Sequence, residues 1–341
     1  MNFRHIIDRR IKPILDTAVA KICGFSYKEI VMARKPHSGK LDSAQVTDLL
    51  FSRLDEHDLN LIISMASSDD QNTLDQADVA DRKRIYLCLG AAYGIESILQ
   101  KTGILGVLPP DDVHAMSRGW LAPAGGYYCA DLVVDVLESV GVKIASLTTL
   151  LDFGCSSGRV ARVLRAAYPH LNLFGCDPNN DAINWAARNL KGIEFSVSTQ
   201  EPPLRQYSEG QFDLGFAISI WTHFGKNAFL RWFDEMFRII RPGGYLLLTT
   251  HGVGSIAHYA HNGQRSVHQL QKNLKRLYVD GFHFSEEFGE NGDWGVKHEE
   301  WGISFVTLEW MMSQLSHQWS LQSFRVAQND GNQDVLLLQR K

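Results

Sequence analysis

The chain of 341 residues lacks the features that mark several classes of protein. It contains no run of about 18 consecutive apolar residues, the length that spans a bilayer, and its first residues lack the apolar core of a signal peptide. Basic residues are not in excess, because 34 Lys and Arg stand against 38 Asp and Glu, a net charge of −4. We therefore expect a cytoplasmic protein with no membrane span and no affinity for nucleic acid through its phosphate backbone.

Cysteine is also scarce, with five residues and no CxxC pair. No cluster of Cys and His has the spacing of zinc ligands, so the sequence predicts no metal site and reduced thiols. Internal repeats and low-complexity tracts are absent as well. What is present is an ordinary globular composition, 45% hydrophobic and 21% charged, in a chain long enough for about two domains.

The first part of the chain carries the pattern of helices. Apolar side chains recur at helical spacing over residues 6–22 and 46–63, and polar or proline-rich segments at 67–72 and 108–112 interrupt them. The sequence therefore predicts a helical accessory domain over residues 1–115.

From residue 116 onward, short apolar runs alternate with amphipathic helices. Strands are predicted at 147–152, 171–176, 193–197, 212–220 and 245–250, and helices at 131–140, 159–168, 181–190 and 228–240. Such alternation is typical of a doubly wound α/β sheet. The chain ends differently, because strand-like runs at 319–327 and 334–339 are joined by a turn-rich segment that predicts an antiparallel hairpin. We expect an α/β fold with a doubly wound seven-stranded sheet and a C-terminal antiparallel hairpin, over residues 116–341.

Residues that can bind a ligand follow the first two predicted strands. Gly154 and Gly158 lie in the turn that closes the first strand, where they permit a tight bend and a close approach to the N–H groups of the next helix. The second strand ends at Asp177, a position where a carboxylate can accept both hydroxyls of a ribose. The two signals together predict a site for a cofactor that contains ribose.

The turn does not suit a dinucleotide. A pyrophosphate needs the second glycine of G-x-G-x-x-G for close approach, and Ser156 stands in its place. Asp152, directly before the turn, suits a cationic ammonium group and suits phosphate badly. An acidic residue at the amino acid end of the ligand and Asp177 at its ribose together describe S-adenosylmethionine (SAM).

Four segments resemble the motifs of the class I SAM-dependent methyltransferases. They are residues 150–158, 174–178, 212–219 and 241–248, in the order of that family. The resemblance extends over about residues 120–341 and implies SAM as the cofactor. Where the family commonly has an acidic residue against the adenine amino group, this chain offers only Thr199 and Gln200 as neutral substitutes. The predicted cofactor-binding residues are Asp152, Gly154, Ser156, Gly158, Asp177, Pro178, Thr199, Gln200 and Ser219.

Two histidines are candidates for a catalytic base. His223 and His251 follow the fourth and fifth predicted strands, and the carboxyl ends of parallel strands deliver residues to the ligand crevice. An imidazole with an ordinary pKa near 6.5 can accept the proton of a hydroxyl acceptor. We prefer His251, because Gly252 frees the backbone beside it, whereas His223 could cap the helix that follows. A structural role for each is the alternative.

Between the fifth strand and the hairpin, about residues 252–303 form an insertion rich in aromatic and acidic side chains, which is typical of a substrate cap. Its carboxylates could bind the hydroxyls of a sugar. The predicted substrate-binding residues are Tyr127, Trp221, Tyr259 and Trp294.

These observations predict methyl transfer from SAM to a hydroxyl of a polar small molecule or saccharide. An amine acceptor, a non-catalytic subunit of the same fold and a nicotinamide-dependent oxidoreductase are the alternatives. Ser156 and the terminal hairpin disfavour the last of these.

Overall fold

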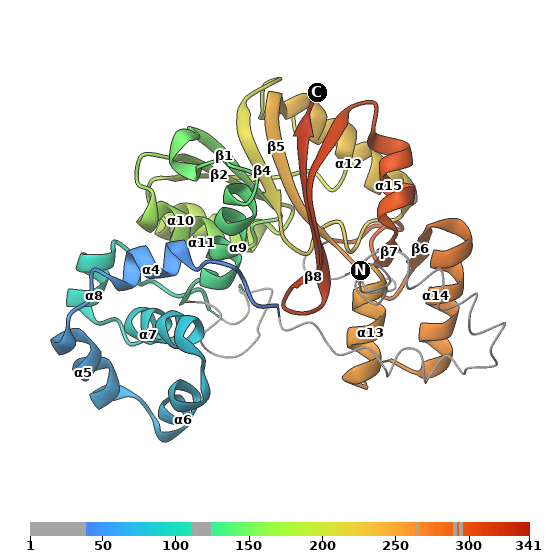
Figure 1. Cartoon of the computed structure of the whole chain (residues 1–341). Helices are drawn as coiled ribbons and strands as arrows, with labels where there is room; N and C mark the ends of the chain where they lie inside the picture. Colours follow the sequence, from blue (N-terminus) through green and yellow to red (C-terminus); the bar gives the residue numbers. More distant parts are fainter. Residues whose placement is uncertain (1–38, 111–112, 114–123, 264, 289–291, 293–295) are drawn as a thin grey trace.

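The computed structural model describes residues 39–110, 113, 124–263, 265–288, 292 and 296–341 (Figure 1). The predicted helical run at 6–22 and the predicted substrate-binding residue Trp294 lie outside these residues. Within them, no helix is long and apolar enough to cross a membrane.

A seven-stranded sheet forms the centre of the molecule. Its strands are β1 (Thr149–Phe153), β2 (Asn172–Asp177), β3 (Ile193–Val197), β4 (Phe212–Ala217), β5 (Ile240–Thr250), β8 (Trp319–Asn329) and β9 (Gln333–Arg340). The strand order is β3-β2-β1-β4-β5-β9-β8. The first five strands run parallel, and β9 pairs antiparallel with both β5 and β8. The predicted doubly wound sheet with its terminal hairpin is therefore confirmed.

Helices cover both faces of this sheet. One face carries α9 (Tyr127–Glu138), α10 (Arg159–Ala167) and α11 (Asn180–Asn189), and the other carries α12 (Lys226–Ile239) and α15 (Leu308–Leu315). The short helix η3 (Ile144–Ser146) leads into β1. Successive side chains of β1 point to opposite faces, so Leu150 joins the first core and Leu151 the second. Both faces are apolar because a parallel sheet is buried on both sides.

Before α9, the described residues form the helices α4 (Gln45–Phe51), α5 (Glu56–Met65), α6 (Ser68–Gln76), α7 (Val79–Ala92) and α8 (Glu96–Thr102). Val46 of α4 and Leu87 of α7 enter the core beside α9, while Ile62 belongs to a separate cluster of this helical part. Asp131 of α9, fully buried, accepts hydrogen bonds from the backbone and hydroxyl of Thr47. The helical part is thus attached through α9. Its predicted end near residue 115 stays a prediction, because 114–123 lie outside the described residues.

The described part of the insertion contains α13 (Val253–His261), α14 (Val267–Asp280) and a small antiparallel sheet of β6 (Phe282–Ser285) and β7 (Ile303–Val306). Figure 1 shows α13 and α14 side by side, beside the end of the β8–β9 hairpin. The last residues of the insertion run along the loop that follows β4. The backbone N–H groups of Gly225, Gly302 and Ser304 each close a hydrogen bond of 2.8 Å between the two segments.

Candidate active site

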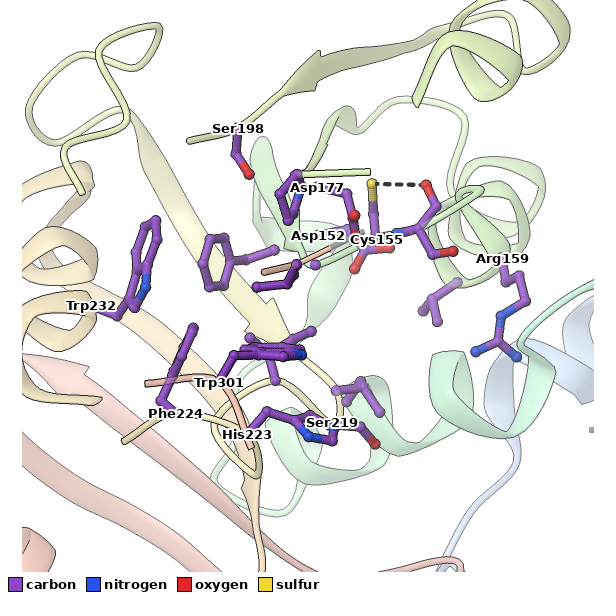
Figure 2. Close-up of a pocket in the computed structure, with 18 of the residues that line it drawn as sticks. Asp152, Cys155, Arg159, Asp177, Ser198, Ser219, His223, Phe224, Trp232 and Trp301 are labelled. Carbon is purple, nitrogen blue, oxygen red and sulfur yellow. Dashed lines mark hydrogen bonds between the residues drawn. The ribbon is translucent and has the colours of Figure 1, made fainter. Parts of the chain in front are cut away.

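A pocket opens at the carboxyl ends of β1, β2 and β4 (Figure 2). All the predicted cofactor-binding residues except Gly158 line it, and so does His223. The sequence-based interpretation missed further lining residues from α9, α10, α12, the loops after β3 and β4, the insertion, and the end of β8 with the turn after it. They include Cys129, Arg159, Val160, Ser198, Phe224, Trp232, Val296, Trp301, Asn329 and Asp330. Arg159 had a usable signal, because a basic residue directly after the turn is unusual at a helix N-terminus.

The turn after β1 is held by the carboxylate of Asp177. The backbone N–H of Ser156 donates to Oδ2 of Asp177 over 2.9 Å, and that of Asn179 donates to Oδ1 over 2.8 Å. Gly154 and Gly158 both have φ of 77°, and Ser156 has φ of 49°, so a serine adopts a conformation that favours glycine. A Cβ on Gly158 would lie 2.8 Å from side-chain atoms of Leu190, so this glycine serves packing beneath the turn.

Asp152 presents an unsatisfied carboxylate oxygen. The residue is 4% exposed, and its Oδ2 has no hydrogen-bond partner among the described residues. Burial raises the pKa of Asp152 to about 7, although the nearby Arg159 acts against this rise. A buried acceptor that the chain leaves unpaired is a natural partner for the ammonium group of a ligand.

Asp177 is engaged with the turn but keeps acceptor capacity, because a carboxylate has about four lone-pair sites. Burial raises its pKa to about 6. The neutral residues of the next loop are already bonded within the protein. Thr199 donates its hydroxyl to the carbonyl of Glu201, and Oε1 of Gln200 accepts the backbone N–H of Lys297 over 3.1 Å.

His223 lies on the pocket wall with one ring nitrogen bonded. Its Nδ1 is 2.8 Å from the carbonyl oxygen of Gly302, which can only accept, so Nδ1 carries the proton and Nε2 holds the free lone pair. The ring packs against Trp301, with centroids 4.8 Å apart. Burial lowers the pKa of His223 to about 4, so the ring is neutral at pH 7.

His251 has a different environment. It is 3% exposed, does not line the pocket, and both of its ring nitrogens are bonded within the protein. Nδ1 lies 3.2 Å from the carbonyl of Ser304, and Nε2 accepts the hydroxyl of Tyr259 over 3.1 Å. Burial lowers the pKa of His251 to about 3. The predicted base His251 thus has both ring nitrogens bonded within the protein and lies off the pocket wall, whereas His223 lines the pocket.

The described substrate-binding candidates also lie off the pocket wall. Trp221 is fully buried, with its ring 5.0 Å from that of Phe233, and Tyr127 is 2% exposed in the core beside α10. Tyr259 bonds His251 inside the insertion. Aromatic side chains after a strand can belong to the core or to a site, and the local sequence does not distinguish the two.

The geometry agrees with the comparisons with known proteins. Residues 150–244 match the family model of a methyltransferase domain. This region is a class I SAM-dependent methyltransferase domain. S-adenosylmethionine is the cofactor of that family, and the unpaired Asp152 oxygen beside the glycine turn fits its ammonium group.

Two curated relatives match parts of the chain. A fatty-acid O-methyltransferase of Mycolicibacterium smegmatis is 30% identical over 103 residues, 29% of this chain and 36% of the relative. A malonyl-acyl-carrier-protein O-methyltransferase of Hahella chejuensis is 24% identical over 148 residues, 41% of this chain and 50% of the relative. The chain thus spans half or less of these relatives.

A solved structure is also similar. CalS10, an amino pentose methyltransferase from Micromonospora echinaspora, is 14% identical with a TM-score of 0.41, covering 62% of this chain and 90% of that one.

Proposed function

We propose that the protein transfers a methyl group from SAM to a hydroxyl of a small-molecule or saccharide acceptor, with His223 as the general base. The observation that carries the proposal is the tautomer of His223. The Gly302 carbonyl holds the proton on Nδ1, which leaves the Nε2 lone pair available on the wall of the cofactor pocket.

Three charged residues of the same pocket suit the cofactor. Asp152 would accept its ammonium group, Asp177 its ribose hydroxyls, and Arg159, at the start of α10, would pair with its carboxylate. Figure 2 shows Arg159 on one side of Asp152 and Ser198 on the other. The arrangement of Arg159, Asp152 and Ser198 along the pocket supports a ligand that lies across the carboxyl ends of β1 and β2.

The bound cofactor supplies a methyl group activated on a sulfonium sulfur. The pocket walls align the acceptor oxygen with the methyl carbon, because the displacement is in line. As the carbon–oxygen bond forms and the carbon–sulfur bond breaks, Nε2 of His223 takes the hydroxyl proton and later releases it to water. The sulfur leaves as a neutral thioether, so charge and atoms balance.

The low pKa of His223 determines both its base strength and its protonation state. With a pKa of about 4, the ring is a weaker base than an ordinary histidine, but it is unprotonated throughout the neutral range. The contribution of the protein is then mainly the position of the lone pair. A hydroxyl acceptor needs such a base, whereas a neutral amine acceptor can react without one.

The test is incubation of the protein with metabolite pools and SAM labelled in its methyl group, followed by mass spectrometry. We expect a product labelled on oxygen, formed by the wild type and strongly reduced in His223→Ala. A product labelled on nitrogen and formed equally by His223→Ala would replace this proposal with N-methylation. Cofactor binding without labelled product from any pool would indicate a non-catalytic subunit.

A further inference from the structure

The part of the pocket around His223 is built from aromatic side chains. Figure 2 shows His223, Phe224 and Trp301 close together, on the side of the pocket away from Asp177 and Ser198. The ring of Trp301 lies with its centroid 4.8 Å from that of His223 and 5.5 Å from that of Phe224. These three rings form an aromatic wall, and the proposed base is one of its members.

The backbone fixes this aromatic wall in place. Phe224 and Trp301 form an antiparallel β-bridge between the loop after β4 and the insertion. Beside the bridge, the backbone N–H of Gly302 donates to the carbonyl of His223 over 2.8 Å. Phe224 is also stacked on Trp232 of α12, with centroids 5.9 Å apart and planes at 18°. The rings are therefore ordered before a ligand arrives, which lowers the cost of binding a flat molecule against them.

Trp301 carries a buried hydrogen-bond donor that the described residues leave unused. The residue is 8% exposed, and its indole Nε1 has no partner among the described residues. A buried donor without an acceptor is unfavourable, and Trp301 lines the pocket, so an oxygen of a bound molecule can satisfy it.

Two carboxylates of the insertion that are able to bind sugar hydroxyls bond within the protein instead. Glu287 pairs with Arg265 through both of its oxygens, at 2.5 and 2.8 Å. Glu300 accepts two backbone N–H groups at the start of α12, at 3.0 and 3.1 Å. In the part of the insertion that the structure describes, only Val296 and Trp301 line the pocket. The insertion thus contributes apolar surface and an indole donor to the pocket, and no acceptor oxygen of a carboxylate.

We infer that the methyl acceptor is a phenol whose ring lies against Phe224 and Trp301, with its hydroxyl at Nε2 of His223 and a second oxygen at the indole N–H of Trp301. The inference rests on the proposed function and narrows its acceptor from any hydroxyl to an aromatic one. The phenol oxygen bonds to the methyl carbon as the carbon–sulfur bond breaks, and its proton passes to Nε2. The products are an aryl methyl ether and S-adenosylhomocysteine, so atoms and charge balance.

The strength of the base agrees with this class of acceptor. Burial lowers the pKa of His223 to about 4, so its imidazole is a weak base. A phenol, with a pKa of about 10, gives up its proton more readily than the aliphatic hydroxyl of a saccharide. A weak base is therefore better matched to a phenol than to a sugar.

The first experiment identifies the atom that receives the label when the intact protein is incubated with metabolite pools and methyl-labelled SAM. Nuclear magnetic resonance of the purified product distinguishes a methyl group on an aryl oxygen from one on an aliphatic oxygen. We expect the label on an aryl oxygen. A label on an aliphatic oxygen would overturn the inference and leave the proposed function intact. A label on nitrogen, or no labelled product, would overturn both.

The second experiment uses calorimetry on the intact protein saturated with S-adenosylhomocysteine. Catechol, which carries two adjacent oxygens on one aromatic ring, is compared at millimolar concentrations with methyl α-glucopyranoside. We expect catechol to bind about tenfold or more tightly than the glycoside. Equal affinities, or no binding of either probe, would overturn the inference. If the wild type does not bind S-adenosylhomocysteine, the proposed function itself fails.

The third experiment isolates the indole donor with Trp301→Phe, which keeps an aromatic ring, and the matched control Trp319→Phe. The indole Nε1 of Trp319 is also buried without a partner among the described residues, but Trp319 does not line the pocket. We expect Trp301→Phe to weaken catechol about three- to tenfold and to keep the affinity for S-adenosylhomocysteine within about twofold. Trp319→Phe should change neither. Equal affinities for catechol in the two variants would overturn the role of Trp301.

Discussion

The two walls of the pocket differ in whether their buried polar atoms have hydrogen-bond partners within the protein. In the wall after β1, Oδ2 of Asp152 and the hydroxyl of Ser156 are buried without partners among the described residues. Near the ends of β4 and β5, the hydroxyls of Ser219 and Thr249 both donate to Oε1 of Gln333. Because an unpaired buried polar group is costly, the first wall has the character of a binding surface and the second of a supporting structure.

The two histidines that follow β4 and β5 show the same contrast. His251 has both ring nitrogens bonded to the protein, whereas His223, which lines the pocket, has only Nδ1 bonded among the described residues. A side chain with one fixed and one available nitrogen is oriented by the fold and still able to react. This contrast supports the proposal that His223 is the base and predicts a structural role for His251, and the following substitutions and titrations can break or sharpen it.

The largest expected effect is on turnover in His223→Ala. Loss of a positioned base should lower kcat by about two to four orders of magnitude, with the affinity for S-adenosylhomocysteine intact, as steady-state kinetics and calorimetry would measure. In the wild type at saturating cofactor, the acid limb of the pH profile of kcat should lie near pH 4, because protonation of Nε2 removes the base.

His251→Ala is the control for this prediction. It should leave the buried carbonyl of Ser304 without its donor and lower the free energy of unfolding by about 1–3 kcal/mol, with a much smaller change in kcat below the melting temperature. Turnover that falls more in His251→Ala than in His223→Ala would reverse the assignment.

The next effect is on cofactor affinity in Asp177→Ala. Removal of the carboxylate should weaken S-adenosylhomocysteine by about tenfold or more, because the ribose hydroxyls lose their acceptor. The melting temperature should fall as well, since Asp177 also holds the backbone of Ser156 and Asn179. Calorimetry would measure the change in affinity, and thermal unfolding would measure the change in melting temperature. Unchanged affinity would remove Asp177 from the cofactor site.

A smaller effect is the pH dependence of cofactor binding. The pKa of Asp152 is about 7 in the free protein, and an ammonium group pairs with its ionised form. Affinity for S-adenosylhomocysteine should therefore rise by up to about tenfold from pH 6 to pH 8 and then level off. In Asp152→Asn the residue no longer titrates, so most of this rise should vanish. A rise that is the same in both proteins would place the titrating group elsewhere.

The smallest effect separates the two glycines of the turn. A Cβ on Gly154 would lie 2.1 Å from Cδ1 of Ile220, which lines the pocket, so Gly154→Ala should weaken cofactor binding by about a few fold. A Cβ on Gly158 meets Leu190 and Phe195 beneath the turn, so Gly158→Ala should lower stability by about 1–2 kcal/mol instead. Thermal unfolding with and without S-adenosylhomocysteine measures both. Equal loss of affinity in the two variants would contradict this division.

The strand boundaries show how much of the fold the local sequence pattern predicts. β3 begins and ends at the predicted residues, and the other predicted strands differ from the observed ones mainly at their ends. β5 begins earlier than predicted, at Ile240, because pairing with Phe212 of β4 extends it across the turn at Pro242. Strand ends depend on a partner that the local sequence does not contain.

By itself, the sequence determined the order of the strands and helices, the turn between Gly154 and Gly158, and two acidic residues, Asp152 and Asp177, that line the pocket. These follow from periodicity and turn chemistry within a few residues. Tertiary structure alone decided which histidine lines the pocket and which residues lie beside the loop after β3. The bond that fixes His223 joins residues 79 apart in the chain, and the bond from Gln200 to Lys297 joins residues 97 apart. Such contacts form only when the insertion packs against the loops of the sheet, so no local pattern encodes them.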